Sequence, residues 1–123
     1  AVYFLELDDY IMKTGDTAEW EAMSHKGCER CSARLDQSRG LVERGEKWDG
    51  GDIRARVLHT YEQDSTTGIW PIDVEVKVAP VKVTGKDGTV VFTDDASVAE
   101  SRIEMAQRDD QWVVVGIGDI PES

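Results

Sequence analysis

Two cysteines three residues apart, Cys28 and Cys31, have the spacing in this chain that most directly indicates chemistry. As a disulfide, they would brace the start of a helix, and a loop this small would stabilise the fold by roughly 2 kcal/mol in the loop-entropy model. As free thiols they could form a redox centre, because a helix N-terminus lowers the pKa of a cysteine. No predicted strand precedes them, and the intervening Glu29-Arg30 is not typical of a thioredoxin-like centre. We therefore predict a disulfide.

Zinc binding is a further possibility for the same cysteines. His25, Cys28 and Cys31 have a spacing compatible with zinc ligation, and His59 could complete a set of four ligands. This spacing is common, and the sequence does not place His59 near the cysteines. No glycine-rich phosphate loop follows a predicted strand, and no Gly-x-Ser-x-Gly motif is present. We predict neither a metal nor a cofactor.

Three side chains could move protons within a cup-shaped fold. Tyr10 lies on a predicted N-terminal helix, while His59 and Tyr61 lie on a predicted strand, on the face that we expect to point inward. A tyrosine in the core and a histidine at the rim are the commoner explanations. No carboxylate occupies an inward position of a predicted strand, so the usual general base is missing, although a helix or loop could supply one.

Tryptophans are the candidates for a ligand-binding surface. Trp20 lies on a short predicted helix, Trp48 lies in a glycine-rich loop, and Trp70 precedes Pro71. Such positions suit a pocket mouth or an interface, but closing the open end of the core is the more frequent role. Trp112 begins a predicted core strand, and we expect it to be structural.

Length and charge limit the classes of function. The 123 residues predict one domain, 1–123, with a formal net charge of −11. Lysines and arginines form no cluster, which disfavours binding to nucleic acid or anionic lipid. No apolar run approaches the roughly 18 residues of a membrane helix. One pair of cysteines fits an oxidising compartment, and a start at Ala1 rather than Met predicts a targeting segment trimmed from upstream.

Helices are predicted in the first third of the chain. Apolar residues at spacings of three and four predict helices over 1–14, 17–24 and 28–44. Gly15 and Gly45 end the first and third of these, because glycine adopts the left-handed conformation that ends helices. Residues 46–51 are predicted to be a turn-rich loop.

Strands are predicted after Gly51, where the period changes to two. The alternating segments are 53–61, 72–78, 81–84, 89–93, 99–105 and 112–117. Asp87-Gly88 is a hairpin signal, and Pro80 predicts an irregularity or an edge. We predict an α+β fold in which three N-terminal helices pack on a curved, antiparallel, four-stranded meander sheet.

Several features together resemble a known family. These are Thr14-Gly15-Asp16-Thr17, the short Trp-containing helix, Ser24 before Gly27-Cys28-x-x-Cys31, Gly50-Gly51, and Trp112-x-Val114. Their order resembles a domain of unknown function from actinobacterial cell-surface lipoproteins, similar in fold to the nuclear transport factor 2-like, or cystatin-like, cone. The resemblance implies export, an extracytoplasmic location, and a lipid anchor on a cysteine upstream of Ala1.

Our first hypothesis is a non-enzymatic extracytoplasmic domain that binds a protein partner or a small apolar ligand through the cone. The alternative is an isomerase or dehydratase that uses Tyr10, His59 and Tyr61 on a small apolar ligand. A thiol-disulfide protein using the cysteine pair is a third hypothesis. Leu58 with Val113 or Val115 also indicates a possible homodimer through the free face of the sheet.

Overall fold

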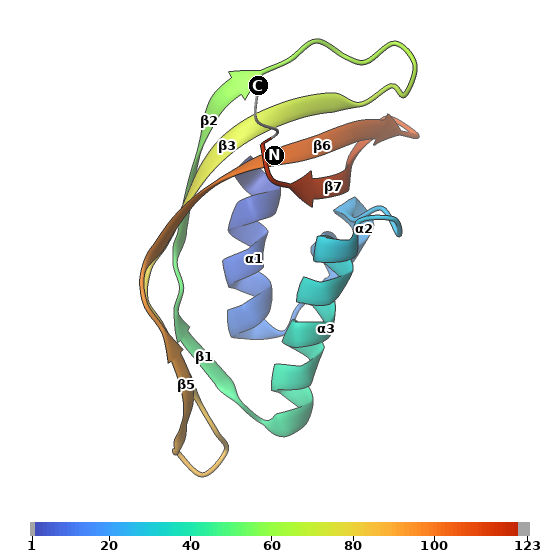
Figure 1. Cartoon of the computed structure of the whole chain (residues 1–123). Coiled ribbons are helices and arrows are strands. Elements are labelled where there is room, and N and C mark those ends of the chain that lie inside the picture. The colour runs from blue at the N-terminus through green and yellow to red at the C-terminus, as the bar shows by residue number, and fades with distance from the viewer. Residues whose placement is uncertain (1, 121–123) are drawn as a thin grey trace.

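Three helices precede seven strands in the computed structural model, which describes residues 2–120 (Figure 1). The helices are α1 (Val2–Thr14), α2 (Ala18–Met23) and α3 (Glu29–Arg44). Gly15 and Gly45, with φ angles of 75° and 66°, follow α1 and α3. The predicted helices and their glycine ends are therefore confirmed. Among the described residues, no helix is long and apolar enough to cross a membrane.

The strands form two antiparallel sheets. They are β1 (Lys47–Gly50), β2 (Ile53–Thr60), β3 (Trp70–Val78), β4 (Val81–Thr84), β5 (Val90–Asp94), β6 (Ser97–Arg108) and β7 (Gln111–Gly118). One sheet has the order β2-β3-β6-β7, and the other has the order β1-β4-β5.

The prediction of a single four-stranded meander is wrong in two respects. The hairpin of β4 and β5 leaves the four-stranded sheet and joins a second one. Residues 47–50, predicted to be part of a loop, form the edge strand β1, in which Trp48 pairs with Val83. Burial of the Trp48 side chain against this hairpin outweighs the turn propensity of the surrounding glycines.

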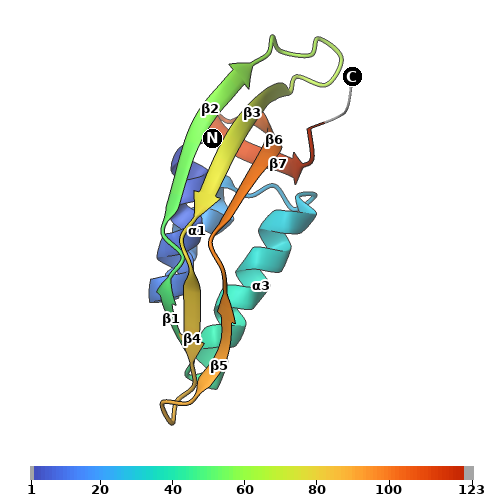
Figure 2. The ribbon, with the colours of Figure 1, turned by 60° about the vertical axis from the view of Figure 1, so that its left-hand side comes forward.

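The two sheets are halves of one curved surface. The chain crosses between them at residues 51–52, 79–80 and 95–96, and the crossing strands keep the same order on both sides. At the bend, the Gly51 amide donates to the Pro80 carbonyl at 3.0 Å, and the Ala79 amide donates to the Asp52 carbonyl at 2.9 Å. Pro80 has no amide hydrogen with which to continue a ladder. The predicted irregularity at Pro80 is therefore confirmed, and Figure 2 shows β3 continuing into β4 across it.

All three helices lie on the concave side of this surface (Figure 1). Phe4 of α1 is fully buried and stacks on Trp20 of α2, with ring centroids 4.0 Å apart. The sheet contributes buried aliphatic side chains beneath them, namely Val74, Ile103 and Val114. Among the closely packed pairs of elements, α3 contacts α1, α2 and β7 rather than β3 or β6. This arrangement leaves room between α3 and the middle of the sheet.

Candidate ligand-binding groove

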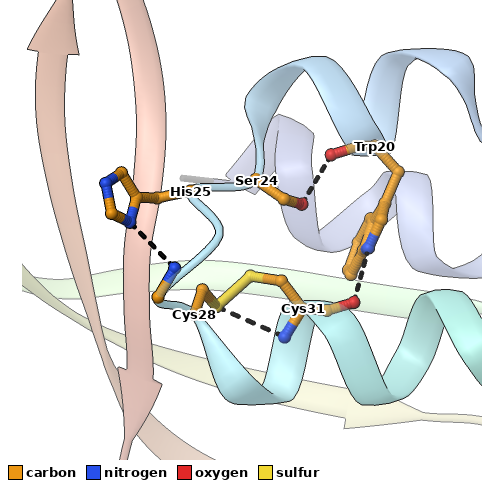
Figure 3. Close-up of a disulfide and its surroundings, with 6 residues drawn as sticks. Trp20, Ser24, His25, Cys28 and Cys31 are labelled. Atoms are coloured by element: carbon orange, nitrogen blue, oxygen red, sulfur yellow. Dashed lines mark hydrogen bonds between the residues drawn. A yellow bond between two sulfur atoms is a disulfide. The ribbon is translucent and has the colours of Figure 1, made fainter.

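The predicted disulfide between Cys28 and Cys31 is present and buried. Cys28 caps α3, where its Sγ accepts a hydrogen bond from the Cys31 amide at 3.3 Å (Figure 3). The Trp20 Nε1 donates to the Cys31 carbonyl at 3.0 Å. Relative exposures of 1% and 0% leave the two cysteines almost no contact with solvent. The pair therefore joins the start of α3 to the core beneath α2.

The buried disulfide argues against a zinc site and against a redox centre at these cysteines. Sulfurs bonded to each other supply no thiolate for zinc, and His25 Nδ1 accepts a hydrogen bond from the Gly27 amide at 2.9 Å (Figure 3). Within residues 2–120, no three His, Cys, Asp or Glu side chains are grouped as metal ligands. Thiol-disulfide exchange requires access to a sulfur, which the burial prevents.

The prediction that His59 and Tyr61 point inward is wrong. A bulge lies between Val57, which pairs with Val74, and His59, which pairs with Asp73. The extra residue, Leu58, reverses the alternation of side chains along β2, so His59 joins the outward face. Both rings consequently lie on the convex side of the sheet, opposite the helices.

On that side, Tyr61 belongs to a hydrogen-bonded cluster. Its hydroxyl donates to Asp73 at 2.7 Å, while the Arg102 guanidinium binds the same carboxylate at 2.8 and 3.1 Å. Asp73 is only 4% exposed, and the His59 ring meets the Tyr61 ring edge to face at 4.3 Å. The hydrogen bonds from Arg102 lower the pKa of Asp73, and the hydrogen bond to Asp73 raises the pKa of Tyr61. Tyr61 thus remains protonated, and Asp73 forms a structural ion pair with Arg102.

Tyr10 lies elsewhere, in a hollow between α1 and α2. Its hydroxyl donates to Asp16 at 3.0 Å, and this hydrogen bond raises the pKa of Tyr10. An enzyme that used Tyr10 with His59 and Tyr61 would need all three on one cavity. The structure instead places Tyr10 on the helical side and the other two on the convex side of the sheet.

An open groove of about 360 Å³ lies between α3 and the concave face of the sheet. Its floor is formed by Val76, Ala99, Ser101 and Ile117. Ala99 remains exposed although it lies on the concave side, because Ala33 of α3 is also too small to fill the space above it. Sequence reasoning missed this groove. The available signal was two small residues, Ala99 and Ser101, at successive inward positions of one strand.

Polar side chains gather along the helical side of the groove. The Arg34 Nε and Nη2 each donate to the Asp8 carboxylate at 2.7 Å, and Nη1 donates to Gln37 at 2.8 Å. The same guanidinium lies 5.1 Å from the centre of the Trp48 ring. Arg30 also lines the groove, one helical turn before Arg34. The site therefore combines an apolar floor with a cationic border.

The three candidate tryptophans lie in three different environments. Trp20 is 2% exposed and stacked on Phe4, and it is one of the residues that line the groove. Trp48 is buried beneath the sheet bend and meets Phe92 edge to face. Trp70 meets Trp112 edge to face at 5.0 Å, beside a second, apolar hollow. Their roles in ligand binding remain predictions.

The three residues predicted to form an apolar homodimer surface are not exposed. Leu58 and Val115 are half-buried, and Val113 is buried. The convex face instead carries charged pairs such as Arg56 and Glu75, which meet at 2.9 Å. Dimerisation through this face stays a prediction.

Comparisons with known proteins place the chain by sequence and by fold. Residues 1–118 match the model of a family of unknown function, DUF6318. Comparison with curated protein sequences found no significant match.

Two solved structures are similar in fold. The intermembrane space region of chloroplast protein ARC6 has a TM-score of 0.69 and 7% sequence identity, over 94% of this chain and 87% of that chain. The protein Aln2 from a Streptomyces species has a TM-score of 0.53 and 16% identity, over 94% of this chain and 83% of that chain. At these identities, the similarity concerns the fold alone.

Proposed function

Because the chain belongs to DUF6318, a family of unknown function, we propose a role for it from its groove. It is a non-enzymatic domain that binds a small apolar ligand in the groove beside α3. The supporting observation is the exposed Ala99 on the concave side of the sheet. Concave faces of this kind are normally filled by core side chains. A groove of about 360 Å³ lies within the usual size range of small-molecule sites.

We further infer that residues 1–123 form one domain of the nuclear transport factor 2-like type, carried by a lipid-anchored surface protein. The disulfide supports an extracytoplasmic location, because disulfides persist in oxidising compartments. The resemblance to lipoprotein domains supports the anchor. Protease treatment of intact cells tests the location: the domain should be digested in intact cells, and full protection would contradict the proposal.

A groove-filling variant tests the proposed function. Ala99→Trp places an indole on the floor of the groove, whereas the control Val98→Trp adds the same group on the opposite face of β6, where Val98 is 64% exposed. Binding is measured by fluorescence titration with Nile red, a neutral apolar dye. The wild type and Val98→Trp should bind the dye, and Ala99→Trp should lose at least about tenfold in affinity, since the added ring occupies the volume that the ligand needs.

Circular dichroism and thermal melts must show that both variants are folded. Equal dye binding by folded Ala99→Trp and the wild type would refute the groove as the binding site. Absence of dye binding to the wild type would also refute the proposal.

A further inference from the structure

We infer that the ligand of the groove is an amphipathic carboxylate, with its apolar chain on the floor and its anionic group bound by Arg30. This inference rests on the proposed function and adds the chemical class of the ligand. Two observations support it. The groove lining carries more positive than negative charge, and only one of its two arginines is hydrogen-bonded to a carboxylate within the described part of the chain.

The groove is cationic on an anionic protein. The chain has 25 Asp and Glu residues against 14 Lys and Arg residues. Among the residues that the structure describes, the groove lining reverses this ratio, with two arginines, Arg30 and Arg34, and one carboxylate, Asp8. An uncharged apolar ligand would leave the Arg30 guanidinium without a partner in the groove, whereas a ligand carboxylate would pair with it.

Each of the three guanidinium nitrogens of Arg34 donates a hydrogen bond within the protein. Two of its nitrogens bind Asp8 in the bidentate arrangement that suits guanidinium and carboxylate, and the third binds Gln37. Its side chain is 25% exposed and that of Asp8 is 18% exposed. Arg34 therefore holds α3 to α1 and shapes the groove, and its charge is matched by Asp8.

Arg30 is differently placed. Within residues 2–120, the carboxylate that pairs with Arg30 is that of Asp119, whose Oδ1 lies 3.8 Å from Nη2, beyond hydrogen-bond distance. The side chains of Arg30 and Asp119 are 54% and 94% exposed, and an exposed pair of this kind contributes little. The Arg30 guanidinium can thus turn to a ligand carboxylate without breaking a strong bond.

The apolar surface begins directly beside this cation. Ala33 lies three residues after Arg30 on the same helix, and Ile117 of β7 lines the same groove. Leu5 and Val76 continue the apolar lining. A carboxylate at Arg30 with an alkyl chain extending over these side chains would satisfy both parts of the site.

Paired ligands of equal chain length test this inference. Decanoate and 1-decanol are compared as competitors for bound Nile red, at neutral pH, where decanoate is ionised. The wild type should bind decanoate more tightly than decanol. Arg30→Gln should weaken decanoate binding by about tenfold, the effect of one charge-assisted hydrogen bond, and leave decanol binding unchanged.

Arg39→Gln is the matched control. Arg39 lies on the same helix, is 53% exposed and pairs with Glu21 at 2.7 Å, outside the groove lining. This variant should bind decanoate like the wild type. Equal binding of decanoate and decanol, or an Arg30→Gln variant that binds decanoate like the wild type, would overturn the inference and leave the proposed function standing. Failure of the wild type to bind Nile red would refute both.

Discussion

Reduction of the Cys28–Cys31 disulfide should destabilise the fold by an amount set mainly by loop closure. The bond joins residues separated by three positions, so it closes a loop of four residues. In the loop-entropy model such a loop loses about 6 cal/mol/K in the unfolded chain, which corresponds to about 2 kcal/mol near 25 °C. For a domain of this size, we expect the melting temperature to fall by roughly 7 °C.

Thermal melts with and without a phosphine reductant measure this effect. Because both cysteines are at most 1% exposed, native reduction should be slow and should require opening of the start of α3. The variant with both Cys28→Ala and Cys31→Ala serves as the control, since its melting temperature should not respond to the reductant. Its own stability should fall further, because two buried sulfurs are removed from the core.

Two outcomes would refute this reasoning. Equal melting temperatures for the oxidised and fully reduced wild type would show that the crosslink contributes no loop entropy. Rapid reduction of the native protein by a mild dithiol would show that the sulfurs are accessible. The second result would favour the thiol-disulfide hypothesis over a structural bond.

Three further substitutions test the sheet. The folded-state pKa of Asp73 is lowered below its unfolded value of about 3.9, so its contribution to stability is present above that value and lost as the pH falls through the folded pKa. Asp73→Asn should therefore show a smaller loss of stability between about pH 5 and pH 2 in urea unfolding, and an unchanged pH profile would contradict the ion pair with Arg102. Gly50→Ala should cost more than about 2 kcal/mol, because φ is 79° and the new Cβ would lie 2.1 Å from the Pro80 carbonyl oxygen. Gly88→Ala, with φ of 86° and no atom within 4 Å of the new Cβ, should cost only about 1 kcal/mol, and equal losses would contradict the clash.

The helical front could be predicted from the sequence because its determinants are local. The spacing of apolar residues predicts α1 and α3, and Gly15 and Gly45 end them through their own φ angles. Two cysteines three residues apart lie within disulfide reach as soon as a helix begins between them. Asp87-Gly88 likewise lies in the tight turn of the β4–β5 hairpin.

The inward and outward faces of the sheet could not be predicted to the same extent. Alternation along β2 holds up to Val57, and the bulge at Leu58 then carries His59 and Tyr61 to the convex side. A bulge depends on how the partner strand pairs, and here that partner is Asp73 of β3. Alternation along β3 puts Asp73 on the outward face, yet Tyr61 and Arg102 bury it there almost completely.

By itself the sequence determined the order of three helices and a strand-rich remainder, the ends of the helices, the crosslink and the anionic character of the chain, since each depends on residue type or on neighbours a few positions away. Only the tertiary structure decided that the strands divide into two sheets at Pro80 and that α3 stands away from Ala99. These features depend on which distant segments pack together. The groove exists because small side chains of α3 and β6 line the same space, and two of them, Ala33 and Ala99, are 66 positions apart in the chain.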